Sequence, residues 1–139
     1  MKIQLAACFF LLTVFLTIPV SVRSNGHPVK QKNPTDPGYA YALVAANHFL
    51  HAWQTGDIEN GMVLLSDGIR HTQNAEKLEQ FFSNGKDRAF EITRGHGHSG
   101  LYSFPIVLVT LRGSHVTRRF SEIVLVETGK DDWVVDKLP

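Results

Sequence analysis

His96 and His98 flank a single glycine, and they are the most suggestive candidates for metal binding in this sequence. Residues i and i+2 of a β-strand point to the same face, so two imidazoles would lie side by side. His71 or His115 would have to add a third ligand. The run from Gly95 to Gly100 also has a second interpretation, a hairpin loop in which polar histidines bind nothing. We therefore expect no cofactor.

Asp67 and His71 are the candidates for general acid–base catalysis. A carboxyl group buried in an apolar cavity has a raised pKa, which suits a base that works near neutral pH. With Ser66 they also supply the residue types of a hydrolase triad, but the sequence has no Gly-x-Ser-x-Gly elbow. Glycine fingerprints for phosphates and dinucleotides are absent as well.

Arginines gather in one predicted hairpin, where Arg118 and Arg119 are adjacent. Neighbouring residues of a strand point to opposite faces, so these two cannot both line one pocket. The inward one could pair with a carboxylate ligand or with Glu122. The alternative places the cations on a solvated or dimer-forming face of the sheet. Arg94, on the preceding strand, is a further candidate for ligand binding.

The first 24 residues have the three parts of a secretory signal. Lys2 precedes an apolar run over 3–20, and Val22-Arg23-Ser24 offers a cleavage site. We therefore expect an exported protein, periplasmic or secreted, that meets a membrane only during export. An uncleaved anchor is the alternative, because the run is almost long enough to span a bilayer. Cys8 precedes most of the apolar run, so no membrane-inserting segment lies upstream of it. We therefore reject lipidation of Cys8.

Cleavage would also change the chemistry of the remaining 115 residues. Cys8 is the only cysteine, so the exported chain would have no disulfide and no thiol. Removal of Lys2 and Arg23 leaves 12 basic and 13 acidic residues. This balance provides no basic field for nucleic acid, and the length fits one domain that core packing alone can stabilise.

The elements that must position these residues begin after a polar, proline-containing leader, residues 25–37. Asp36 and Pro37 predict the start of a helix, and Gly56 its end. The apolar stripe of this helix recurs at spacings of three and four: Tyr39, Ala42, Leu43, Ala46, Phe49, Leu50 and Trp53. Asp57 predicts a second, short helix through Leu65.

Between this second helix and the strands we expect a turn at 66–68 and a short extended piece over 69–72. A third helix over 74–84 would end at Gly85 as its C-cap. The apolar period then changes to two, which predicts strands over 88–96, 101–112, 116–128 and 133–138.

The loops predict how these strands pair. Gly113-Ser114 suits a type II′ hairpin that pairs Arg112 with His115 and Val107 with Phe120. The runs 97–100 and 129–132 would close the other two hairpins. Pro105 predicts a bulge or bend inside a long strand. The fold class is therefore α+β, with N-terminal helices packed on a curved antiparallel sheet.

Residues 39–71 resemble the opening of nuclear transport factor 2-like (NTF2-like) domains. The run 46–57 ends in a Gly-Asp pair and is followed by Leu64-Leu65-Ser66-Asp67. The later elements match in order, so residues 38–139 resemble one such domain, an exported bacterial member of the superfamily. This resemblance implies a conical pocket between the helices and the sheet. The implied candidates for its lining are Tyr39, Leu43, Trp53, Asp67, His71, Arg94 and Arg118.

Two functions follow as expectations. The first is a non-enzymatic exported domain that binds a small molecule or an envelope protein as a homodimer. It rests on the strand 101–111, which is apolar on both faces. The helices would cover one face, and a partner subunit would bury the other. The second is a small lyase, isomerase or cyclase-like enzyme with Asp67 or His71 as general base in the pocket.

Overall fold

The computed structural model describes residues 36–83 and 87–139. Its helices are α1 (Pro37–Thr55), α2 (Ile58–Val63), α3 (Asp67–Thr72) and α4 (Ala75–Phe82). Its strands are β1 (Arg88–Ile92), β2 (His96–His98), β3 (Leu101–Arg112), β4 (His115–Gly129) and β5 (Asp132–Lys137). The predicted signal, most of the leader and Gly85 lie outside the described residues. None of the described helices is long and apolar enough to cross a membrane.

Helix α1 has the termini that the sequence predicts. The carboxylate of Asp36 accepts a hydrogen bond from the Gly38 N–H at 3.0 Å, and Pro37 occupies the first turn. Gly56 ends the helix in the left-handed region, with φ 75°. The buried side chains of α1 are Ala42, Ala46, Phe49, Leu50, Ala52 and Trp53, so the predicted stripe faces the interior.

The segment after α2 differs from the prediction, because residues 67–72 form helix α3 rather than a turn and an extended piece. The Ser66 hydroxyl accepts a hydrogen bond from the Ile69 N–H at 3.2 Å, which makes Ser66 an N-cap. Asp67 in the first turn and Arg70 in the last turn match the helix dipole. The predicted third helix is α4, with Asn74 as its N-cap.

The sheet is an antiparallel meander in the order β1-β3-β4-β5, with β2 also paired to β3. The predicted hairpin register is confirmed, since Arg112 pairs with His115 and Val107 with Phe120. Of the two loop residues only Gly113 has a positive φ, 59°, as a type II′ turn requires. The β4–β5 hairpin turns at residues 130–131, within the predicted run.

The edge strand is interrupted opposite Pro105. Ile92 pairs with Ile106 and His96 with Ser103, so residues 93–95 face only two residues of β3. This extra residue is a β-bulge, and it divides the predicted strand 88–96 into β1 and β2. The predicted bulge inside the strand of Pro105 is therefore wrong in its position: the β3–β4 register is unbroken there, and the bulge lies in the neighbouring edge strand.

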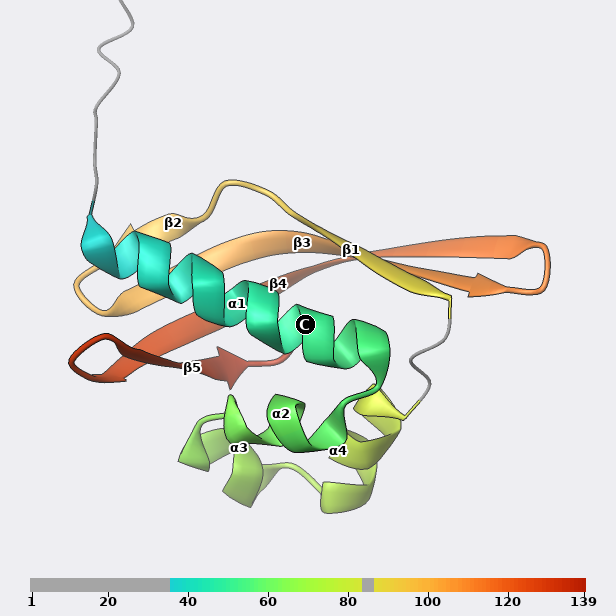
Figure 1. Ribbon diagram of the computed structural model, residues 1–139, viewed down its shortest axis with the longest axis horizontal. Coiled ribbons are helices and arrows are strands. Elements are labelled where there is room, and N and C mark those ends of the chain that lie inside the picture. The colour runs from blue at the N-terminus through green and yellow to red at the C-terminus, as the bar shows by residue number, and fades with distance from the viewer. Residues whose placement is uncertain (1–35, 84–86) are drawn as a thin grey trace, which may run out of the picture. The chain divides into compact units, whose positions relative to one another are not determined.

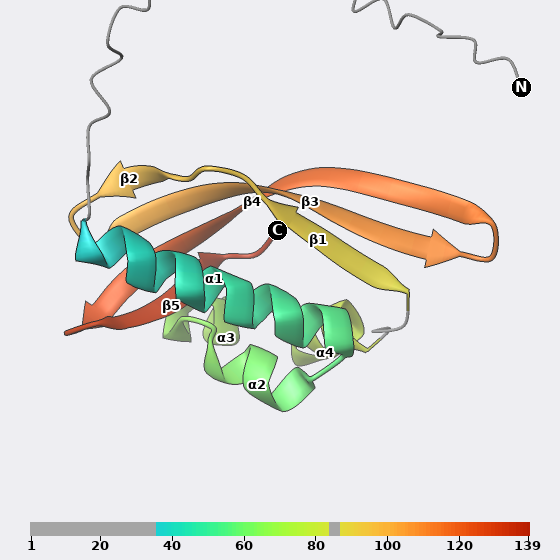
Figure 2. The same ribbon diagram turned by 45° about the horizontal axis from the view of Figure 1, so that its top comes forward.

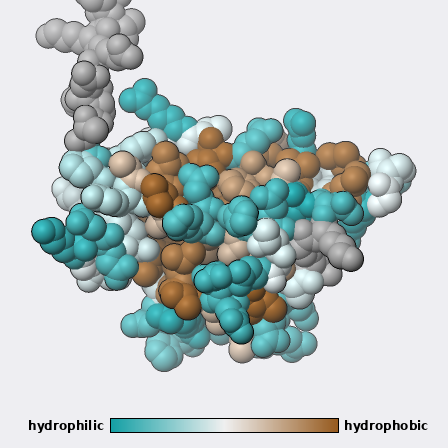
Figure 3. Space-filling view, viewed as in Figure 1, coloured by the Kyte–Doolittle hydropathy of each residue, from teal (hydrophilic) through white to brown (hydrophobic). Residues whose placement is uncertain are grey.

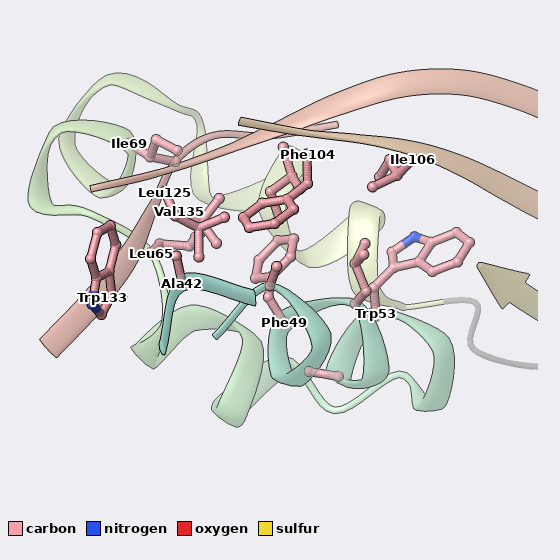
Figure 4. Close-up of a cluster of buried hydrophobic side chains, with 14 of the residues drawn as sticks. Ala42, Phe49, Trp53, Leu65, Ile69, Phe104, Ile106, Leu125, Trp133 and Val135 are labelled. Atoms are coloured by element: carbon pink, nitrogen blue, oxygen red, sulfur yellow. The ribbon is translucent and has the colours of Figure 1, made fainter. Parts of the chain in front are cut away.

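The helices lie on one side of the sheet. Figures 1 and 2 show α1 along one face, and α2, α3 and α4 beyond the β5 edge. A parallel bridge between Leu65 and Val135 joins this group to the sheet. Side chains of α1 meet those of β3, β4 and β5 in a closely packed interior (Figure 4). Phe49, Phe82 and Phe104 are its largest fully buried side chains.

Candidate ligand groove and sheet surface

A groove runs between the N-terminal half of α1 and the bulged edge strand. It consists of two adjoining cavities, which share Tyr39 and Arg94. The inner cavity, about 410 Å³, is lined by Tyr39, Leu43, Asn47, Phe90, Ile92, Thr93 and Arg94. The outer cavity, about 360 Å³, is lined by Asp36, Tyr39, Arg94, Gly95, His96, Gly97 and Tyr102. Cavities of this size bind small molecules in other proteins.

The bulge holds the wall of this groove against α1. The Gly95 N–H donates a hydrogen bond to the Tyr39 hydroxyl oxygen at 3.2 Å. A Cβ atom on Gly95 would lie 2.4 Å from the Phe104 ring, so only glycine allows this close approach. The Thr93 N–H donates to the Pro105 carbonyl at 3.0 Å. Tyr39 and Arg94 are therefore held on one rim although they are 55 positions apart.

Tyr102 forms the end wall of the outer cavity. Its ring packs edge-on against Tyr39, with centroids 5.5 Å apart, and only 3% of the residue is exposed. Its hydroxyl donates a short hydrogen bond to the Asp36 carboxylate, which also caps α1. This hydrogen bond, the burial of the ring and the charges of Asp36 and Glu127 raise the pKa of Tyr102 to about 12.

We expect this raised pKa to make the fold sensitive to alkali. In the unfolded chain Tyr102 ionises with the ordinary tyrosine pKa of 10.0, whereas in the folded chain its pKa is about 12. The stabilisation is therefore complete below pH 10 and is lost as the pH rises through 12. A tyrosinate absorbance titration of the wild type minus that of Tyr102→Phe should contain one transition near 12. A transition near 10 would contradict the buried hydrogen bond.

Trp53, a predicted pocket residue, belongs to the interior instead. It is 4% exposed and contacts neither groove cavity. The guanidinium carbon of Arg88 lies 4.7 Å from its ring centroid, a cation–π geometry. The spacing that suggested Trp53 as a pocket residue was the apolar stripe of α1, and this stripe faces the sheet. Only Tyr39, Leu43 and Arg94 of the seven predicted residues come together in the groove.

Asp67 and His71 do not meet in a cavity. Both are exposed on α3, and the Asp67 side chain, 83% exposed, pairs with Arg70 at 2.7 Å. Neither residue lines the groove, the cavity between α1 and α2, or the cavity at the N-terminus of α1. The space where the resemblance implied a conical pocket is occupied by Phe49, Phe104 and their neighbours. The structure thus does not provide the closed pocket that the acid–base hypothesis requires.

The two histidines of β2 share a face, as predicted, but the structure brings no third ligand to them. Both are exposed and pair with outward residues of β3, His96 with Ser103 and His98 with Leu101, and His96 also borders the outer cavity of the groove. His115 pairs with Arg112 at the far end of β3, roughly 35 Å away at about 3.3 Å per residue. Among the residues that the structure describes, no group of three His, Cys, Asp or Glu could hold a metal ion.

The outer face of the sheet, the side away from α1, carries many apolar side chains. Strand alternation places outward the exposed Leu101, Leu111, Val116 and Phe120 and the half-buried Val107, Val109, Val124, Val126 and Val134. Phe120 is 80% exposed and Val116 61%. Arg118 pairs with Val109 on this face, whereas Arg119 pairs with the inward Leu108. Arg118 is therefore outside the groove, and the predicted pocket role does not fit its position.

The end of the β3–β4 hairpin projects beyond α1 and the rest of the sheet (Figures 1 and 2). We call residues 111–116, which extend past the last pair with β1, the arm. The space-filling view shows apolar side chains reaching the surface along the arm, among polar ones (Figure 3). Nearer the middle of the outer face, Ser103 and Lys137 donate hydrogen bonds to Glu122 and lower its pKa.

Sequence reasoning missed several residues of these surfaces, including Phe90 and Ile92 in the groove. Tyr102 and Asn47 line the groove, and Phe120 dominates the outer face. The predicted register already paired Phe120 with Val107, and alternation from the buried strand centre would have placed it outward. No local pattern marks Tyr102, because its role depends on Asp36, 66 positions earlier.

Comparison with known proteins identifies the fold. No family model and no curated protein matches this chain. The designed protein Rd1NTF2_05 with five substitutions superposes with a TM-score of 0.57 and 13% identity, over 73% of this chain and 96% of that chain. A Campylobacter jejuni protein described as an NTF2-like transpeptidase gives 0.49 and 12%, over 69% and 97%. The first likeness confirms the predicted NTF2-like α+β fold, and at this identity it concerns the fold alone.

Proposed function

We propose that this chain is an exported, non-catalytic binding domain that pairs with a second copy of itself through the outer face of its sheet. The observation that carries the proposal is Phe120, which is 80% exposed within a band of valines and leucines. Soluble monomers rarely expose contiguous apolar patches of more than a few hundred Å². Export follows from the pattern of residues 1–24, and the domain is proposed to span 38–139.

The dimensions of the outer face suit a homodimer. β1, β3, β4 and β5 contain 5, 12, 15 and 6 residues. At about 3.3 Å per residue and about 4.8 Å between strands, these strands together cover roughly 600 Å², without counting the relief of the side chains. This area is comparable to the approximately 800 Å² that each partner buries in a standard interface.

The charges around Phe120 are self-complementary. Arg118 and Glu122 lie two residues before and after it, on the same face of β4. A two-fold axis at Phe120 would place Arg118 of one copy opposite Glu122 of the other. An envelope protein of different sequence is the competing partner, and in that case the isolated chain would be a monomer.

Phe120→Glu should convert the dimer into a monomer. A carboxylate at the centre of a desolvated apolar interface has no partner, and loss of a central aromatic anchor weakens dimers by about 100-fold or more. Sedimentation equilibrium would measure the mass of the wild type and the variant. Val63→Glu is the matched control, because Val63 is 70% exposed on α2, away from the sheet. A wild-type monomer at high micromolar concentration would refute the homodimer.

A small ligand in the groove is the second part of the proposed function. It is favoured by the fact that three of the predicted pocket residues, Tyr39, Leu43 and Arg94, line one cavity. The outer face and the groove are on different sides of the edge strand. Ligand binding and pairing can therefore be tested separately.

A further inference from the structure

We infer that the groove binds a small carboxylic acid with an apolar body. This inference rests on the proposed role as a binding domain, but it does not depend on pairing through the outer face. It follows from three properties of the groove: two hydrogen-bond donors without acceptors on its rim, the positive charge of one of them, and an apolar floor.

The donors at the rim are Tyr39 and Arg94. The Tyr39 hydroxyl accepts from the Gly95 N–H, and no described residue accepts its own proton. Arg94 is exposed, and the two ion pairs between described residues, Arg70–Asp67 and Lys137–Glu122, do not involve it. A guanidinium fork and a phenol proton on one rim match the two oxygens of a carboxylate.

The charges of the lining select an anion. Arg94 is the only charged residue among those that line the inner cavity. Asp36 lines the outer cavity, but its two oxygens already accept hydrogen bonds from Gly38 and Tyr102. An ammonium ligand would meet the like charge of Arg94 in the inner cavity. A neutral ligand would leave the guanidinium without its best partner.

The floor of the inner cavity selects the rest of the ligand. Leu43, Phe90 and Ile92 are half-buried apolar side chains that also pack against the interior. Asn47 donates its amide N–H to the Leu43 carbonyl at 2.9 Å, so its carbonyl oxygen is the acceptor that it presents. A volume of about 410 Å³ admits a ring or short chain. The ligand therefore places its carboxylate at Arg94 and its apolar part over these three side chains.

Phenylpropanoate and its neutral amide, phenylpropanamide, form a matched pair of probes, and phenylpropylamine supplies the opposite charge. The full chain, purified in the form in which cells export it, is titrated with each probe by calorimetry and NMR. We expect the acid to bind about tenfold more tightly than the amide, and the amine more weakly than both. Methyl signals of Leu43 and Ile92 should shift on binding.

Variants separate the charge from the cavity. Arg94→Met retains most of the apolar stem, so it should weaken the acid about tenfold and leave the amide unchanged. Tyr39→Phe should weaken the acid a few-fold, and Arg118→Met, an exposed arginine outside the groove, should have no effect. Equal affinities for acid and amide, an acid affinity unchanged in Arg94→Met, or no binding of any probe would each overturn the inference. The molecular mass of the same samples shows whether the chain forms a homodimer. A failure of the carboxylate proposal can therefore be distinguished from a failure of the homodimer proposal.

Discussion

Phe104→Ala should lower the free energy of unfolding by about 4 kcal/mol, the usual cost of removing a fully buried aromatic ring. Phe104 is 0% exposed and its ring centroid lies 5.4 Å from that of Tyr39. The backbone of Gly95, in the edge strand, packs directly against the Phe104 ring. Surrounding atoms can therefore collapse only partly into the space that the ring leaves. Urea denaturation of the wild type and the variant would measure the difference.

The same substitution tests whether side chains fill the interior of the cone. An apolar cavity left by the ring should bind a small aromatic such as indole, and such binding would raise the melting temperature of the variant but not of the wild type. A loss of this size is a large part of the free energy of unfolding of a typical domain, so the alanine variant could fail to fold. Phe104→Leu is the milder second variant, and we expect it to lower the free energy of unfolding by less than about 1.5 kcal/mol. Losses below about 1 kcal/mol in both variants would show that Phe104 does not fill the interior.

Local signals explain which elements the sequence predicts well. α1 begins at Asp36-Pro37 and ends at Gly56, since each of these residues satisfies or spares a backbone group at a helix end. The register of β3 and β4 follows from the two-residue turn at Gly113, because a hairpin loop of fixed length determines every pair beyond it. These features depend on neighbours within a few residues.

The incorrect predictions concern segments whose structure is determined by tertiary contacts. Residues 67–72 are too short to show an apolar period, and only the Ser66 cap and the dipole-matched charges indicate a helix. Once this segment is helical, Asp67 and Arg70 are neighbours on one exposed face, and Asp67 cannot line a pocket. The groove was predicted in part. The bulge at 93–95 brings Arg94 next to Tyr39. Pro105 led us to expect a bulge in its own strand, whereas the bulge lies in the neighbouring edge strand.

Arg88→Met should lower the free energy of unfolding by about 3 kcal/mol, because one guanidinium closes the ends of two helices. It donates to the carbonyls of Trp53, Phe81 and Phe82 at 2.9, 3.2 and 3.4 Å. These carbonyls belong to the last turns of α1 and α4, where no helical N–H reaches them. A cation there also opposes the negative end of each helix dipole. Methionine keeps an apolar stem of similar length but removes the guanidinium from the Trp53 ring and leaves the carbonyls without a donor.

Two further variants separate this role from charge in general. Burial, and secondarily the nearby Arg112, lower the pKa of Arg88, so these two influences disfavour its positive charge and the hydrogen bonds must outweigh them. Arg112→Met, an exposed change in the same neighbourhood, should alter stability by less than about 0.5 kcal/mol. Arg88→Lys should recover about half of the loss, since one ammonium cannot reach three carbonyls at once. Equal losses for Arg88→Met and Arg112→Met would mean that net charge, and not the closing of α1 and α4, stabilises this end of the molecule.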